Sequence, residues 1–158
     1  MRKLAWVVTT TALAAVVMSA GDVFAEEAKA AAYDSVLAGS LGADDMGMKR
    51  YVLVILKTGP TRVPEGPERD AMFRGHFENM KRLSDAGKLV LAGPLDGVSG
   101  WRGLYVFATA NLEEAKALVA TDPVIIEGEM VAECHTYYGS AALMTIPGTH
   151  ERIAKKRH

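Results

Sequence analysis

The stretch YVLVIL at residues 51–56 decides the fold of this 158-residue chain. It is a continuous apolar run of strand length, rich in β-branched side chains, and it predicts a strand that is apolar on both faces. A helical pattern follows from Glu68 to about Asp85, with apolar-side residues at spacings of three and four: Met72, Phe73, His76, Phe77, Met80 and Leu83. The predicted domain therefore begins with a strand and an amphipathic helix.

Three more strands and a second helix follow. Residues 88–92 and 101–108 predict two strands joined by the turn LDGVSG, and residues 129–138 predict a fourth strand. Asn111 and Glu114 have the spacing of a capping box, and the helix that they open is broken at TDP, residues 121–123. The order β-α-β-β-α-β predicts an α+β domain of the ferredoxin-like type, a four-stranded antiparallel sheet with both helices on one face.

The two faces of this sheet predict a partner subunit. On the first strand, Tyr51, Leu53 and Ile55 are as apolar as the residues that alternate with them. Helices on one face would leave the other apolar face uncovered, and such a face needs a second layer. We therefore expect a homodimer in which the second sheet supplies that layer.

The ends of the chain predict export and a tail. Arg2 and Lys3 precede the apolar run at residues 4–17, a pattern typical of a secretory signal cleaved after Ala25. Retention of the run as a membrane anchor is the alternative, and the mass of the exported protein distinguishes the two. We expect a signal peptide at 1–25, a flexible linker at 26–48, the domain at 49–143 and a disordered tail at 144–158. The mature protein would be periplasmic or secreted, without stable membrane insertion.

Composition limits the partners. The formal net charge is -1, and no strand pair combines basic and aromatic residues, so we do not expect nucleic acid as a partner. Cys134 is the only cysteine of the chain, and we expect it to be a packing residue. The sequence has neither a glycine-rich loop before a helix nor closely spaced metal ligands, and we expect no cofactor and no metal.

His76 and Asp96 form the candidate catalytic pair. His76 lies on the apolar side of the first helix, and Asp96 follows the strand after that helix, so the β-α-β connection can bring the two side chains together. A carboxylate fixes the tautomer of an imidazole and raises its basicity, as general acid/base catalysis requires. The alternatives are a core histidine and an ordinary turn aspartate.

The fourth strand supplies a second group of candidates. Glu133, His135 and Tyr137 alternate on one side of it, and Cys134 points to the other side. We expect His135, Tyr137 and Arg102 to bind the substrate. The alternative for the strand residues is a set of hydrogen bonds at the subunit interface.

Several stretches resemble the YCII-related (YciI-like) family over about residues 50–143: GHFENMKRLSDAGKLVLAGPLDG at 75–97, GLYVF at 103–107, NLEEA at 111–115, Asp122-Pro123 and HTYYG at 135–139. The resemblance implies a dimeric α+β barrel and a His–Asp active site, carried over onto His76 and Asp96. It also implies cofactor-free lyase-type chemistry, such as dehydrochlorination of a substituted hydroxyquinone. The chain departs from the family in its signal peptide and in reading His-Thr-Tyr-Tyr where His-Pro-Trp-Tyr is more usual.

These observations lead to one functional hypothesis and two rivals. The hypothesis is an exported, cofactor-independent enzyme in which His76 and Asp96 perform acid/base chemistry of the lyase or isomerase type on a small organic molecule. One rival is a non-catalytic dimeric domain that binds a small ligand, and the other is a purely structural module.

Overall fold

The computed structural model describes residues 32–156. The chain divides into two units, Met1–Tyr33 and Asp34–His158, and the account below concerns the second. The signal peptide expected at residues 1–25 lies outside the described residues. Among residues 32–156, no helix is both long enough and apolar enough to cross a membrane.

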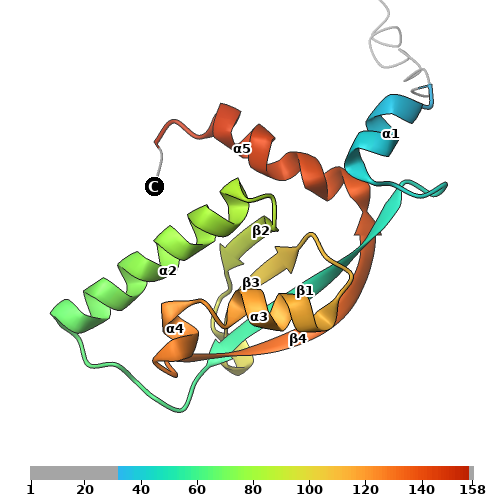
Figure 1. Ribbon diagram of the computed structural model, residues 1–158. Helices are drawn as coiled ribbons and strands as arrows, with labels where there is room; N and C mark the ends of the chain where they lie inside the picture. The colour runs from blue at the N-terminus through green and yellow to red at the C-terminus, as the bar shows by residue number, and fades with distance from the viewer. Residues whose placement is uncertain (1–31, 157–158) are drawn as a thin grey trace, which may run out of the picture. The chain divides into compact units, whose positions relative to one another are not determined.

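Four strands form one antiparallel sheet in the order β2-β3-β1-β4 (Figure 1). They are β1 (Met48–Thr58), β2 (Leu89–Pro94), β3 (Trp101–Phe107) and β4 (Met130–Ser140). β1 is central and pairs with both β3 and β4, which explains why the run at residues 51–56 is apolar on both faces. The predicted α+β fold and its four strands are confirmed.

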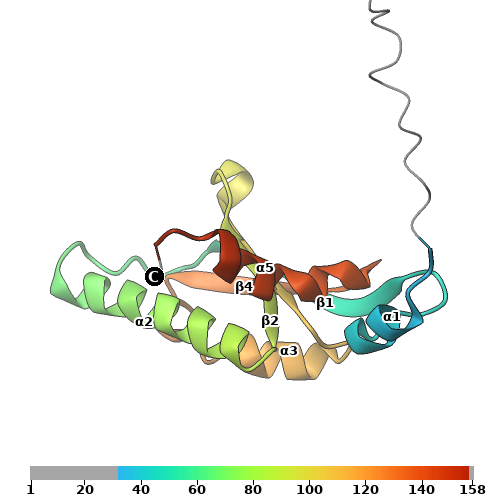
Figure 2. The same ribbon diagram turned by 90° about the horizontal axis from the view of Figure 1, so that it is seen from above.

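Three helices cover one face of the sheet: α2 (Pro67–Asp85), α3 (Leu112–Val119) and α4 (Pro123–Ile126). The main core lies between them and the sheet, and its buried members include Val52, Val54, Leu56, Met72, Leu83, Leu89, Tyr105, Phe107, Ala115, Val119, Val124 and Met130. Asn111 caps α3 as predicted, because its side chain accepts hydrogen bonds from the amides of Glu113 and Glu114. Seen from above, α2 and α3 lie on the same side of the strands (Figure 2).

The C-terminal segment covers part of the opposite face. It consists of a 3-10 turn, η2 (Ala141–Thr145), and the helix α5 (Ile146–Ile153). Leu143 and Met144 pack against a second buried cluster formed by Tyr51, Val90 and Val106. Figure 2 shows α5 on the side of the sheet away from α2 and α3. The prediction of a disordered tail at 144–158 is therefore wrong, because apolar residues that follow β4 find an apolar sheet face beside them.

The flexible linker predicted at 26–48 is likewise wrong for its described part. The helix α1 (Ser35–Leu41) occupies it and contacts η2. The side chain of Asp34 caps this helix by accepting a hydrogen bond from the Leu37 amide, and Gly42 ends it in a left-handed conformation with φ of 68°. These two local signals outweigh the lack of a sustained apolar period.

A buried carboxylate, Glu129, fastens the proline-rich loop between β1 and α2. Its side chain accepts a hydrogen bond from the Val63 amide at 2.8 Å and forms an ion pair with Arg69 at 2.9 Å. Burial alone would raise the pKa of Glu129, but the hydrogen bonds from Val63 and Arg69 outweigh it and hold that pKa below its usual value. The loop between β1 and α2 is therefore anchored to the residue that precedes β4.

This anchor predicts an acid-sensitive contribution to stability. Because the pKa of folded Glu129 is lowered, its contribution is full above the ordinary glutamate pKa of 4.5 and is lost as the pH falls through the folded pKa. Glu129→Gln should lower the free energy of unfolding at neutral pH by on the order of 3 kcal/mol, since it leaves the buried Arg69 with only the exposed Glu65 as a charged partner. Thermal melts between about pH 3 and pH 7 should show this difference shrinking as the pH falls.

A matched control is Glu133→Gln, which removes an exposed ion pair and should cost less than about 1 kcal/mol. A difference between the Glu129→Gln variant and the wild type that does not change with pH would contradict the assignment.

Candidate functional site

His76 lies on the buried side of α2, as its position in the apolar pattern predicted. It is 8% exposed and has three aromatic neighbours. The rings of Phe73 and Phe77 meet it edge-on at 6.1 Å and 5.3 Å between centroids, and the ring of Tyr105 on β3 stacks at 6.3 Å. The imidazole therefore lies among aromatic rings between the helix and the sheet.

Asp122 is the carboxylate that holds this imidazole. Nδ1 of His76 lies 2.9 Å from each of its two carboxylate oxygens. Asp122 is fully buried at the connection between α3 and α4, where it also caps α4 by accepting a hydrogen bond from the Val124 amide at 3.2 Å. The hydroxyl of Tyr105 donates to its Oδ2 at 2.8 Å. Asp122 thus joins α2, β3 and α4 through one buried side chain.

The partners of His76 assign its tautomer. Nδ1 faces the oxygens of Asp122 and, at 3.3 Å, the hydroxyl of Tyr105, so it carries the proton. Nε2 makes no hydrogen bond to any residue in 32–156. The one buried side-chain atom without a partner in that range is Nδ2 of Asn79, so Nε2 retains some accessible surface. The lone pair of His76 is therefore on the nitrogen that faces away from Asp122.

Tyr105 stays protonated beside this carboxylate. Burial raises the pKa of its phenol, and the charge of Asp122 and the hydrogen bond to it raise that pKa further. Tyr105 is 2% exposed. Its hydroxyl therefore acts as a hydrogen-bond donor toward Asp122.

A close approach of two helices positions Asp122 against His76. Gly75 precedes His76 on α2, and a Cβ added there would lie 3.0 Å from Cγ of Pro123 at the start of α4. Only a residue without a side chain lets α4 sit this near to α2 without a shift. The sequence pair Gly75-His76 thus meets the pair Asp122-Pro123.

The structure does not bring Asp96 to His76. Asp96 lies in the exposed connection between β2 and β3, which includes a short 3-10 turn, η1 (Val98–Gly100), and it accepts a hydrogen bond from the Val98 amide at 3.1 Å. This connection projects from the face of the sheet opposite α2 (Figure 2). The carboxylate beside His76 is that of Asp122 and not that of Asp96, because β2 and the turn after it lead away from the helical layer. Asp96 has the turn role that was its alternative.

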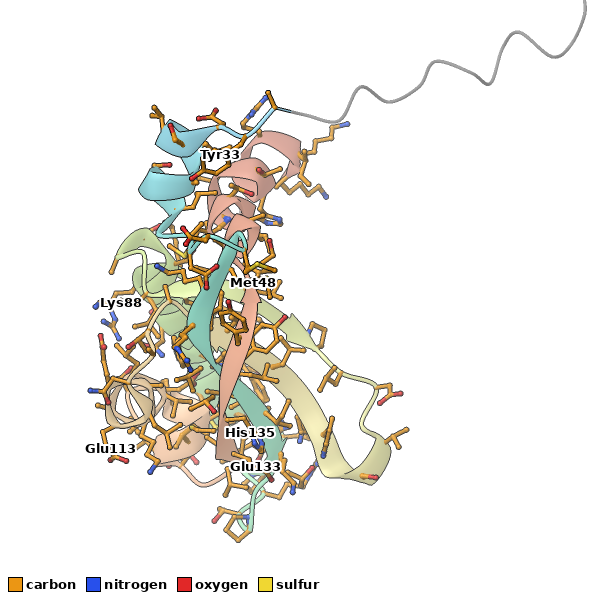
Figure 3. The ribbon with its side chains drawn as sticks, turned by 90° about the vertical axis from the view of Figure 1, so that its right-hand side faces the viewer. Tyr33, Met48, Lys88, Glu113, Glu133 and His135 are labelled. Atoms are coloured by element: carbon orange, nitrogen blue, oxygen red, sulfur yellow. The ribbon has the colours of Figure 1, made fainter. Side chains whose placement is uncertain are left out.

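His135 and Tyr137 lie on the other face of the sheet from His76. His135 bonds Oε1 of Glu133 at 2.8 Å, and Oε2 of Glu133 bonds Lys57 at 3.2 Å. Hydrogen bonds from Lys57 and His135 lower the pKa of Glu133. The ring of Tyr137 is 6.1 Å from that of Tyr51. Glu133 and His135 lie together on β4, apart from Glu113 on α3 (Figure 3). The predicted alternation along this strand is confirmed.

Arg102 belongs neither to the cluster of His76 and Asp122 nor to that of Glu133 and His135. One guanidinium nitrogen lies 3.8 Å from Oε1 of Glu129, so its charge adds to the anchor of the loop between β1 and α2. The five predicted site residues are thus spread over a helix, an exposed turn, the opposite sheet face and the loop anchor. Of these, His76 and Arg102 each lie near a buried carboxylate, His76 at 2.9 Å from Asp122 and Arg102 at 3.8 Å from Glu129.

The sequence contained signals for the two missed residues. Asp122 precedes a proline at the start of a helix, which marks it as a helix cap, whereas the sequence patterns above identify it only as part of a helix break and of the family resemblance. Tyr105 was counted as an apolar strand residue. A buried tyrosine hydroxyl usually needs a polar partner, and that need was the available signal.

Two surface grooves lie near the helices. An apolar one of about 500 Å³ runs between α3, α4 and β4, and a polar one of about 290 Å³ lies between α2 and the residues beside Asp122. His76 lines neither groove. Within the part of the chain that the structure describes, no cluster of three or more His, Cys, Asp or Glu residues could hold a metal ion.

The comparison with family models agrees with the stretches quoted above up to residue 134, and HTYYG at 135–139 lies beyond the matched range. The model of the YCII-related domain matches residues 50–134, which is more than half of the chain and includes His76, Tyr105 and Asp122. No curated protein matches the chain. The segments α1, η2 and α5 lie outside the matched range. The chain belongs to the YCII-related domain family.

Proposed function

We propose that this protein is a cofactor-independent enzyme in which His76 acts as the general base or acid. The observation that carries the proposal is the hold of Asp122 on Nδ1, at 2.9 Å, which leaves Nε2 without a partner among the described residues. A buried carboxylate that fixes one nitrogen of an imidazole makes the other nitrogen a better base. In this proposal Asp122 takes the orienting role first given to Asp96.

The chemistry that fits this arrangement is of the lyase or isomerase type. Nε2 takes a proton from a carbon that is acidified by a neighbouring carbonyl or activated ring. The electron pair of the broken C–H bond then forms a new double bond. In an elimination the leaving group departs with its own bonding pair, and in an isomerisation His76 returns the proton at another carbon. The apolar surroundings of His76 favour a small organic substrate.

A second candidate function is ligand binding without turnover. Two observations favour it: His76 is 8% exposed, and the apolar groove of about 500 Å³ is lined by residues of α3, α4 and β4 instead. In that case the contacts among His76, Asp122 and Tyr105 serve to tie three elements together. Measurement of catalysis separates the two functions.

Proton exchange at carbon tests the enzymatic proposal. The wild-type protein should speed the incorporation of deuterium from D2O into one or more members of a panel of small carbonyl compounds and substituted phenols, followed by NMR. His76→Asn should lower this rate by about 100-fold or more, because it removes the base. Asp122→Asn should also lower it, and a thermal melt shows whether each variant is folded.

The controls are His135→Asn and Asp96→Asn, two exposed polar residues outside the proposed pair, and both should retain the wild-type rate. A His76→Asn variant as fast as the wild type would contradict the proposal. A wild-type protein that exchanges no compound faster than buffer does would favour ligand binding.

We further propose the ferredoxin-like arrangement and a homodimer in the form of a dimeric α+β barrel. The sheet order and the free outer edges of β2 and β4 support it, because a second sheet could pair with these edges. Trp101, Val131 and Tyr137 are also large residues that remain partly exposed. The apolar sheet face that predicted a dimer is smaller than expected, since Leu143 and Met144 cover part of it.

Light scattering tests the dimer. The wild-type protein should have twice the mass of one chain at micromolar concentration, and Tyr137→Asp should shift it toward the monomer by placing a charge in the interface. Ile126→Asp is the matched control, because Ile126 is exposed on α4, on the helical side of the sheet. A monomeric wild type would contradict the proposal.

Export remains part of the proposal. It rests on Arg2, Lys3 and the apolar run that follows them, and it places the protein in the periplasm or outside the cell. A mature protein that begins at Glu26 would support it, and a protein found only in the cytoplasm with an intact N-terminus would contradict it.

A further inference from the structure

We propose that Tyr105 is a positioning residue that sets how strongly Asp122 holds His76. The inference deepens the proposed function, and its catalytic consequence rests on that function. The feature that carries it is the sharing of one buried carboxylate between a tyrosine hydroxyl and an imidazole. Tyr105 touches no substrate in this account and acts through Asp122.

The geometry makes Tyr105 and His76 competitors for the same oxygen. Oδ2 of Asp122 accepts from the Tyr105 hydroxyl at 2.8 Å and lies 2.9 Å from Nδ1 of His76. Oδ1 is also 2.9 Å from Nδ1 and accepts from the Val124 amide at 3.2 Å. Three donors therefore share two oxygens, with no water to compete, because Asp122 is fully buried. Each donor draws electron density from the carboxylate and weakens its bonds to the other two.

The hydroxyl is the part of Tyr105 that this role requires. The ring packs edge-on against Phe107 at 5.8 Å between centroids, and a phenylalanine would fill the same space. The hydroxyl, in contrast, has its partners in Asp122 and, at 3.3 Å, in Nδ1 of His76. Burying a hydroxyl raises the free energy of the folded state unless the hydroxyl is hydrogen-bonded. The hydroxyl of Tyr105 therefore needs Asp122 as its acceptor.

Among residues 32–156, the side chains that hydrogen-bond the His76 ring are those of Asp122 and Tyr105. The guanidinium of Arg82 bonds Thr121, beside Asp122, at 3.1 Å. Tyr105 faces His76 from β3 and Asp122 from the connection between α3 and α4. From α2 itself, the ring neighbours are Phe73 and Phe77, which carry no charge. Removal of the Tyr105 hydroxyl should therefore act on His76 through Asp122, with little contribution from elsewhere.

Tyr105→Phe tests the inference through the NMR signals of the His76 ring. With one donor removed, Asp122 should bond Nδ1 more strongly, and the Nδ1 proton resonance should move downfield from its wild-type position. Tyr51→Phe is the matched control. Tyr51 is also fully buried, on the other face of the sheet, and its hydroxyl donates to the Ser140 carbonyl at 3.0 Å. It should lose comparable thermal stability and leave the His76 signals unchanged.

A second measurement needs no substitution and uses the wild-type protein. Biosynthetic incorporation of 3-fluorotyrosine makes the hydroxyl a stronger donor, so the Nδ1 proton of His76 should move upfield, in the opposite direction to Tyr105→Phe. Tyr51→Phe grown with the same label checks that Tyr51 is not the source of the shift.

The outcomes separate this inference from the proposed function. Equal His76 signals in the wild type, Tyr105→Phe and Tyr51→Phe would overturn the role of Tyr105, even if the protein is an enzyme. The predicted shifts in a protein that catalyses no exchange would keep the role and reject the enzymatic function. Where turnover is measured, Tyr105→Phe should change its dependence on pH, which loss of stability alone would not do.

Discussion

The structure around the site depends on one buried carboxylate, that of Asp122. A charge this far from water is tolerated only when hydrogen bonds replace its hydration, and Asp122 receives them from His76, Tyr105 and Val124. Because these donors come from α2, β3 and α4, the requirement to satisfy the charge also fixes the distance between the helical layer and the sheet. Gly75 allows that distance, since any larger residue would press on Pro123.

The same contacts give His76 the arrangement that the proposed general base requires. Its Nδ1 is committed to Asp122, and its Nε2 is left with accessible surface in an apolar setting. The hydrogen-bond network that joins α2, β3 and α4 therefore also orients the imidazole of His76. The opposite face of the sheet is apolar where the C-terminal segment packs on Tyr51, Val90 and Val106, and its Glu133–His135 pair is half exposed.

Sequence patterns were sufficient for the parts of the fold that depend on local periodicity. The run at 51–56, the helix that bears His76 and the alternation of Glu133, His135 and Tyr137 all follow from spacing, and so does the cap at Asn111. The partner of His76 was missed because Asp96 and Asp122 both follow elements that could approach His76, and only the path of the chain after β2 decides between them. The helices α1 and α5 were missed because a cap and two apolar residues, without a repeated period, were enough to fix them.

The central claim is that Asp122, and not Asp96, orients His76. Long-range proton–nitrogen NMR of the imidazole ring tests it most directly, because the two tautomers give different nitrogen shifts. If Asp122 orients His76, the wild type should carry the proton on Nδ1. Asp96→Asn should give the same signals, and Asp122→Asn should give altered signals. A wild-type proton on Nε2, or signals that change in Asp96→Asn and not in Asp122→Asn, would contradict it.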